Sequence, residues 1–184
     1  MKTWLFNPFI YIAGLKALLI GFMFMTVTLV ISYYSKTHFD GAIDAHIGLK
    51  APISLYALEQ VIAWGSVVLT CFIVARVISK STIRFIDIAG TMALSRAPML
   101  LVAIIGFMPV LHNTKPGQLG SAVLVIGLIM IIPVIWMITL MFNAFKTSAN
   151  IKGTRVIVGF ITALLVAEIL SVSLNHIIRP LLLK

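Results

Sequence analysis

Charged side chains are scarce in this chain, and their scarcity is the first constraint on its class. Only 10% of the 184 residues are Asp, Glu, Lys or Arg, whereas 61% are hydrophobic and the mean hydropathy is +1.13. A water-soluble domain of this length carries about a quarter charged residues. One hydrophobic core cannot enclose so much apolar surface. The composition therefore excludes a soluble globular protein and indicates an integral membrane protein.

Cysteine and catalytic signatures are also lacking. The single cysteine, Cys71, lies in an apolar run, so the chain has no intrachain disulfide and no CxxC redox or zinc motif. It contains no G-x-S-x-G, HExxH, P-loop or GxGxxG pattern. No aspartate lies deep in an apolar segment, and the histidines fall outside these segments or at their outer ends. We therefore expect no enzyme activity, no catalytic residues and no cofactor.

Long apolar runs dominate what is present. Five of them can cross a hydrocarbon core of about 30 Å, which takes about 20 helical residues. None shows the period-two alternation of a membrane strand, and helices satisfy their own backbone in lipid. The sequence predicts an all-α integral membrane protein, one domain over residues 1–184 built as a bundle of five transmembrane helices. The expected spans are residues 10–34, 53–78, 86–111, 119–143 and 154–178.

Basic residues outnumber acidic ones, 14 Lys plus Arg against 5 Asp plus Glu. They are spread thinly between apolar runs, so we expect no nucleic-acid partner; their positions near span ends predict orientation, because cytoplasmic loops are enriched in Lys and Arg. Seven basic residues lie on one side of the membrane: Lys2, Arg76, Lys80, Arg84, Lys146, Lys152 and Arg155. Five lie on the other: Lys36, Lys50, Lys115, Arg179 and Lys184. This bias predicts a cytoplasmic N-terminus and an external C-terminus. Anionic lipid headgroups are the expected partners of the basic inner face.

Two segments carry a family resemblance. The third span, "GTMALSRAPMLLVAIIGFMP", and the last, "IKGTRVIVGFITALLVAEILSVSLNHII", resemble the Yip family of Ypt/Rab-interacting five-span membrane proteins, most closely its bacterial members. The resemblance implies a five-helix domain of the bacterial cytoplasmic membrane, no catalytic residues, and a role in membrane organisation or partner binding. The family's third-span Gly-to-Pro pattern is present as Gly90 and Pro98 with wider spacing, and its acidic-aromatic stretch is absent. Rab binding is therefore not implied.

Four ionisable residues fall inside the predicted spans: Lys16, Glu59, Arg96 and Glu168. Each is unfavourable at the centre of an isolated helix by at least about 2.5–3.5 kcal/mol, so such residues usually face the bundle interior and pair. Lys16 lies about 9 Å from the inner edge and can reach it as an anchor. Arg96 lies about 15 Å deep, beside Pro98, which frees the carbonyl of Leu94.

The depths of the acidic residues suggest partners for Arg96. Glu59 lies about 9 Å below the outer edge and Glu168 about 21 Å above the inner edge, which is one level in a core of about 30 Å. Arg96 starts about 6 Å lower. We predict that Arg96 pairs with Glu168, Glu59 or both.

The loop "HFDGAIDAH" arranges His38, Asp40, Asp44 and His46 around a glycine. Imidazole with carboxylate suits zinc and related ions, whereas a solvated loop whose acids offset basic neighbours explains the same residues. No metal ligand is assigned from the sequence, and these four residues stay candidates.

Two functions from different classes fit the sequence. The first is a non-enzymatic scaffold or partner-binding subunit that binds a membrane protein or a second copy of itself. The second is a small oligomeric transporter or lipid-handling protein, with Lys16, Glu59, Arg96 and Glu168 lining a polar path. The lipid bilayer is a partner in both.

Overall fold

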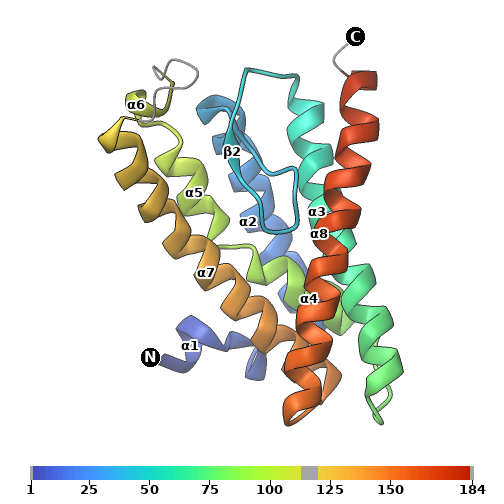
Figure 1. The fold of residues 1–184 in the computed structure, drawn as a ribbon. Helices are drawn as coiled ribbons and strands as arrows, with labels where there is room; N and C mark the ends of the chain where they lie inside the picture. Colours follow the sequence, from blue (N-terminus) through green and yellow to red (C-terminus); the bar gives the residue numbers. More distant parts are fainter. Residues whose placement is uncertain (1, 113–119, 183–184) are drawn as a thin grey trace.

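The computed structural model describes residues 2–112 and 120–182, and within them the chain is an all-α bundle (Figure 1). Five helical segments are long and apolar enough to cross a membrane. They are α2 (Gly14–Ser35), α3 (Ile53–Ile78), the pair α4 (Phe85–Ser95) and α5 (Met99–Ile105), α7 (Ser121–Ala149) and α8 (Thr154–Leu182). Shorter elements are α1 (Lys2–Phe6), the 3-10 turn η1 (Pro8–Ile10), α6 (Pro109–His112) and the strands β1 (Thr37–His38) and β2 (His46–Ile47). The predicted fold class, a bundle of five membrane-length helices, is confirmed.

Helix ends follow local signals that hydropathy does not register. The predicted bounds of α3 are confirmed, but α2 begins at Gly14 instead of residue 10, because Pro8 starts a 3-10 turn and Gly14 adopts φ +58°. The predicted first residue of the fourth span, 119, lies outside the described residues. α7 and α8 continue to Ala149 and Leu182, beyond the predicted ends at 143 and 178. α7 stops only where Asn150 turns left-handed, with φ 50°.

The third span is broken, which corrects the single helix predicted over 86–111. α4 ends before Arg96 and α5 starts after Pro98, which has no amide hydrogen to continue the helical ladder. Ala97 N donates to Leu94 O at 3.1 Å and Met99 N donates to Arg96 O at 2.9 Å. The Leu94 carbonyl is therefore satisfied by a tight turn rather than left exposed. Past α5 the chain turns again and resumes as α6.

The broken span lies at the centre of the bundle. In its most apolar stretch 72% of the residues are buried, against 17% in α7, which is the least covered of the five. α2 crosses α4 at glycines: a Cβ added at Gly90 would collide with the Gly14 carbonyl, and one at Gly21 would collide with the backbone at Ala93. This close crossing sets α4 deep among its neighbours. Arg96, at the end of α4, is consequently placed in the interior.

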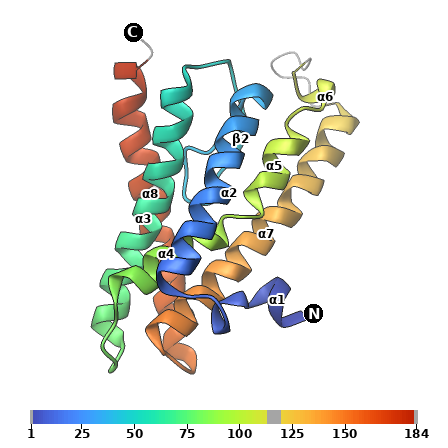
Figure 2. The same cartoon turned by 180° about the vertical axis from the view of Figure 1, so that it is seen from behind.

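The connector between α2 and α3 folds back into the bundle. We call residues 36–48 the inserted hairpin; its strands pair Thr37 with Ile47 and His38 with His46. Seen from both sides, it descends from the end of the bundle where the chain terminates into the space between α2, α5 and α8 (Figures 1 and 2). Phe39 and Ala42 at its tip belong to the main core. Non-helical backbone at membrane depth requires protein partners for its polar groups, and the functional site is built from those partners.

Candidate functional site

Three of the four ionisable residues predicted inside the membrane meet at the inserted hairpin. Glu59 and Arg96 are buried, with exposed fractions of 1% and 3%, and Glu168 is half-buried. Each of the three binds a hairpin atom. Lys16 is exposed on α2 and makes no ion pair in the described part of the chain. It fits the anchor interpretation, whereas the other three hold the hairpin.

Arg96 and Glu168 bind opposite ends of one peptide group. Arg96 Nη1 donates to the carbonyl of Ala42 at 2.9 Å, and the amide of Ile43 donates to Glu168 Oε2 at 3.0 Å. This carbonyl and this amide belong to the same peptide bond, so its dipole lies between a cation and a carboxylate. Both charges polarise the peptide in the same sense, so each hydrogen bond strengthens the other.

The direct ion pair predicted for Arg96 is corrected by this arrangement. Within the described residues the guanidinium forms no ion pair with Glu59 or Glu168. The backbone carbonyl of Ala42 contacts the guanidinium, where a carboxylate of Glu59 or Glu168 was predicted. Arg96 and Glu168 instead share one hairpin peptide group, and Glu59 contacts the side chain of His38.

One face of α8 presents a row of polar side chains to the hairpin. Ser171 Oγ accepts from the amide of Ala42 at 2.9 Å, and Asn175 Nδ2 donates to the carbonyl of Asp40 at 2.6 Å. Arg179 Nη1 lies 3.5 Å from Asp40 Oδ2. Glu168, Ser171, Asn175 and Arg179 recur at spacings of three or four residues, which place them on one helix face.

Glu168 was expected from the sequence to be a buried polar residue, whereas Asn175, further along the same face, was not. Asn175 is buried and binds the hairpin, yet it received no role because an amide carries no charge to flag it. The spacing of polar residues along the last span was the available signal. A polar stripe inside an apolar helix marks the face that packs on a polar neighbour.

Glu59 pairs with His38, not with Arg96. His38 Nδ1 lies 3.0 Å from Glu59 Oε2, and both side chains are fully buried. Because His38 Nε2 contacts the carbonyl of Leu49 at 3.0 Å, that nitrogen must carry a hydrogen and donate. His38 Nδ1 lies close to both oxygens of the Glu59 carboxylate, at 3.1 and 3.0 Å. The His38 ring also stacks on the ring of Tyr56, with centroids 4.4 Å apart.

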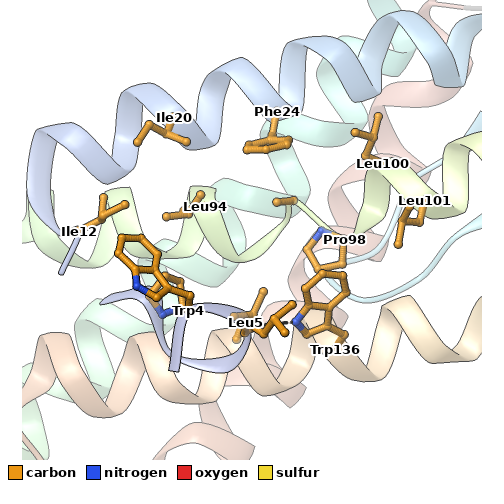
Figure 3. A pocket seen from close by; sticks show the side chains of 13 residues that line it. Trp4, Leu5, Ile12, Ile20, Phe24, Leu94, Pro98, Leu100, Leu101 and Trp136 are labelled. Atoms are coloured by element: carbon orange, nitrogen blue, oxygen red, sulfur yellow. Dashed lines mark hydrogen bonds between the residues drawn. The ribbon is translucent and has the colours of Figure 1, made fainter. Parts of the chain in front are cut away.

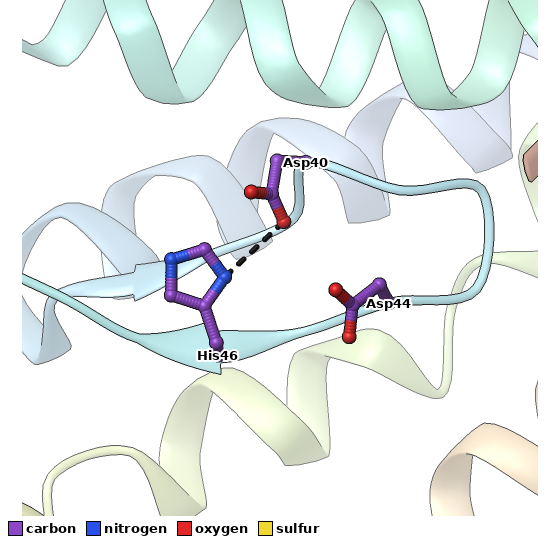
Figure 4. A group of neighbouring side chains, drawn as sticks. All are labelled: Asp40, Asp44 and His46. Atoms are coloured by element: carbon purple, nitrogen blue, oxygen red, sulfur yellow. Dashed lines mark hydrogen bonds and ion pairs between the residues drawn. The ribbon is translucent and has the colours of Figure 1, made fainter. Parts of the chain in front are cut away.

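Three of the four candidate metal ligands converge on the exposed side of the hairpin. Asp40, Asp44 and His46 each offer a ligand atom, and these atoms lie within 4.8 Å of one another (Figure 4). His46 Nδ1 is 3.2 Å from Asp40 Oδ1, with side chains 38% and 22% exposed. The fourth candidate, His38, is not in this group because Glu59 and the Leu49 carbonyl engage both of its nitrogens.

The His46–Asp40 contact shifts both groups. The hydrogen bond to Asp40 raises the pKa of His46 above its ordinary value, although burial opposes this. Burial raises the pKa of Asp40, but the hydrogen bond and charge of His46 and the charge of Arg179 outweigh it, so that pKa is lowered. Asp40 is therefore an ionised carboxylate near neutral pH.

A separate apolar cavity of about 410 Å³ opens on the side of the bundle between α2, α5 and α7 (Figure 3). Trp4 and Leu5 of α1 border it, together with Pro98 and Trp136. α1 is held across α7 by two backbone contacts: Trp136 Nε1 donates to Leu5 O and Asn143 Nδ2 donates to Phe6 O, each at 2.8 Å. The cavity presents almost no hydrogen-bonding groups.

The chain matches no protein-family model, no curated protein sequence and no solved structure. What the site can do is therefore inferred from the contacts of its residues. The buried polar residues of three spans bind backbone of the same chain, which fixes the inserted hairpin in place. Among the described residues, one group of possible metal ligands remains outside these contacts. It consists of Asp40, Asp44 and His46.

Proposed function

We propose that the protein is a non-enzymatic, Yip-like membrane protein that acts as a scaffold or partner-binding subunit. One observation carries this proposal: Glu59, Arg96 and Glu168 each bind the inserted hairpin. A transporter would need those side chains free along a path across the membrane. Here they hold a rigid structural element, which suits a protein whose task is to present a fixed surface.

α7 is the surface that favours a partner, and the occupant we propose is a transmembrane helix of another membrane protein. Its outer half, residues 121–132, contains no buried residue. A Cβ at Gly127 would meet nothing, so another backbone can approach closely there. A cavity of about 280 Å³ beside Gly127, bordered by Ile43 and Val102, leaves α7 further unsupported.

A photo-crosslinking residue tests this surface. Placed at Leu128 or Ile132, which are 66% and 67% exposed on α7, it should give one discrete protein adduct in the native membrane. The control position is Ile177 on α8, 65% exposed and, like Leu128, about 8–11 Å from the helix end on the same side. It should give no discrete protein adduct.

Adducts with lipid alone, equal at α7 and α8, would contradict partner binding. That outcome would favour the second candidate, a lipid-handling protein, for which the apolar cavity bordered by Trp4 and Trp136 is the supporting observation. Discrete adducts of twice the chain mass would instead identify the partner as a second copy.

We also infer a bacterial cytoplasmic membrane location, with the N-terminus inside and the C-terminus outside. α1 and the last turns of α8 lie toward opposite ends of the bundle (Figure 1). The loops α3–α4 and α7–α8 share one end, where Arg76, Lys80, Arg84, Lys146, Lys152 and Arg155 are all exposed. At the other end Asp40 lies beside Arg179 and offsets its charge; Lys115 and Lys184 lie outside the described residues. Exposed basic loops favour the cytoplasmic side.

Reporter fusions test this orientation. A periplasm-dependent reporter fused after Lys184 should be active, and the same reporter inserted at Thr82 should be inactive. A cytoplasm-dependent reporter should give the reverse pattern at both positions, which controls for expression. Activity of the periplasmic reporter at Thr82 with none after Lys184 would invert the assignment.

A further inference from the structure

We propose that Asp40, Asp44 and His46 bind one divalent transition-metal ion of the zinc class at the exposed side of the inserted hairpin. The three ligand atoms come from both arms of the hairpin and already lie within 4.8 Å of one another (Figure 4). No role in the proposed function requires this cluster. The inference therefore stands or falls independently of partner binding.

The donor set decides the class of ion. One imidazole nitrogen with two carboxylates suits zinc and its neighbours, whereas calcium and magnesium prefer oxygen donors alone. Three protein ligands leave a fourth position open to water, which is the usual arrangement of a zinc site that is not purely structural. The half-exposed side chains of Asp40 and His46 leave that position accessible.

Two of the ligands are already held in place. His46 stacks on His38, with ring centroids 5.3 Å apart, and His38 is fixed by Glu59. The backbone of Asp40 is held by Asn175 Nδ2 at 2.6 Å. Such supporting contacts orient ligands and are a regular part of metal sites in proteins. The metal would take the place of the direct contact between His46 Nδ1 and Asp40 Oδ1, which lie 3.2 Å apart.

The third ligand is free to close on the ion. Asp44 is exposed, and within residues 2–112 and 120–182 its side chain accepts one hydrogen bond, from the neighbouring amide of Ala45 at 2.8 Å. Zinc–oxygen and zinc–nitrogen bonds are about 2.0–2.2 Å, so a rotation of this side chain must bring it nearer to the other two. With His46 neutral, two carboxylates against the single charge of Arg179 leave the cluster with net negative charge.

Zinc binding to the tag-free, detergent-purified full chain tests the site. Equilibrium dialysis against Zn²⁺ followed by elemental analysis should find about one ion per chain, since three ligands complete one such site. Asp44→Asn and His46→Ala should each weaken binding at least about tenfold, because even the loss of a supporting residue usually costs that much. The matched control is His176→Ala, an exposed histidine at the same end of the bundle but outside the cluster, which should bind as the wild type does.

Arg179→Gln supplies a change of opposite sign. Removing this cation should tighten zinc binding by about tenfold, the repulsion expected in water between a divalent ion and a single charge about 6 Å away. Asp44→Asn should keep the fold because among the described residues its side chain is hydrogen-bonded only to the neighbouring amide of Ala45, and an unchanged thermal unfolding midpoint verifies this. A wild-type chain that retains no zinc, or a variant Asp44→Asn/His46→Ala that retains it undiminished, would overturn the proposal.

Discussion

Replacing Arg96 with methionine should lower the free energy of unfolding by about 3 kcal/mol, although methionine fills a similar volume. The substitution removes the donor to the Ala42 carbonyl, which then lies in the interior without that partner. It also removes the cation facing the Glu168 carboxylate across the same peptide group. Equilibrium unfolding of the purified protein in mixed micelles measures this loss.

The double variant Arg96→Met/Glu168→Gln should recover much of the stability lost in Arg96→Met. Glutamine can still accept the Ile43 amide hydrogen while it removes the charge that Arg96 balanced. Lys16→Met is the matched control: it deletes a positive charge from another span at an exposed position and should change stability by less than about 0.5 kcal/mol. If Arg96→Met and Glu168→Gln destabilise the protein additively, the two side chains are not coupled through the peptide group between Ala42 and Ile43.

Replacing His38 with leucine should destabilise the protein by about 3–5 kcal/mol, because it leaves the Glu59 carboxylate buried without its partner. The Leu49 carbonyl also loses its donor. His176→Leu, at an exposed histidine, controls for the loss of an imidazole and should be nearly neutral. The same unfolding assay in mixed micelles measures both variants.

A second substitution distinguishes the pair from simple packing. In the variant His38→Leu/Glu59→Met both polar partners are replaced by apolar groups, which is often close to neutral for a buried pair. We therefore expect it to be clearly more stable than His38→Leu alone. Equal instability of the single and double variants would mean that the ring is needed for its shape and its stacking on Tyr56.

The class of fold could be predicted because it depends on short-range properties of the chain. Length and apolarity of each run determine which helices form in lipid, and the bounds of α3 agree to the residue. The break in the third span had a visible cause in Pro98, but the size of the resulting turn depends on how Ala97 and Met99 find acceptors. Hydropathy contains no such information.

The burial of Glu59 and Arg96 was foreseen, whereas their partners were not. The high free energy of a charge in lipid implies burial for a residue that lies too deep in a span to reach the interface. The partner of each charge, however, depends on where the α2–α3 connector runs. Depth estimates treat connectors as lying outside the bundle, and here the connector inserts. The hydrogen bonds from α8 to the hairpin join residues 125 to 135 positions apart, which no local pattern encodes.

The placement of the inserted hairpin also determines when, during biosynthesis, the hairpin can pack into the bundle. Its residues leave the ribosome directly after the first span, but three of their hydrogen-bond partners, Glu168, Ser171 and Asn175, belong to the fifth. Until that last helix is made, the amide groups of Ala42 and Ile43 must remain bound to water at the membrane surface. The hairpin can therefore enter the bundle only as a closing step, after translation of the whole chain. If translation stalled before α8, the hairpin amides that bind Ser171 and Glu168 would still be hydrogen-bonded to water.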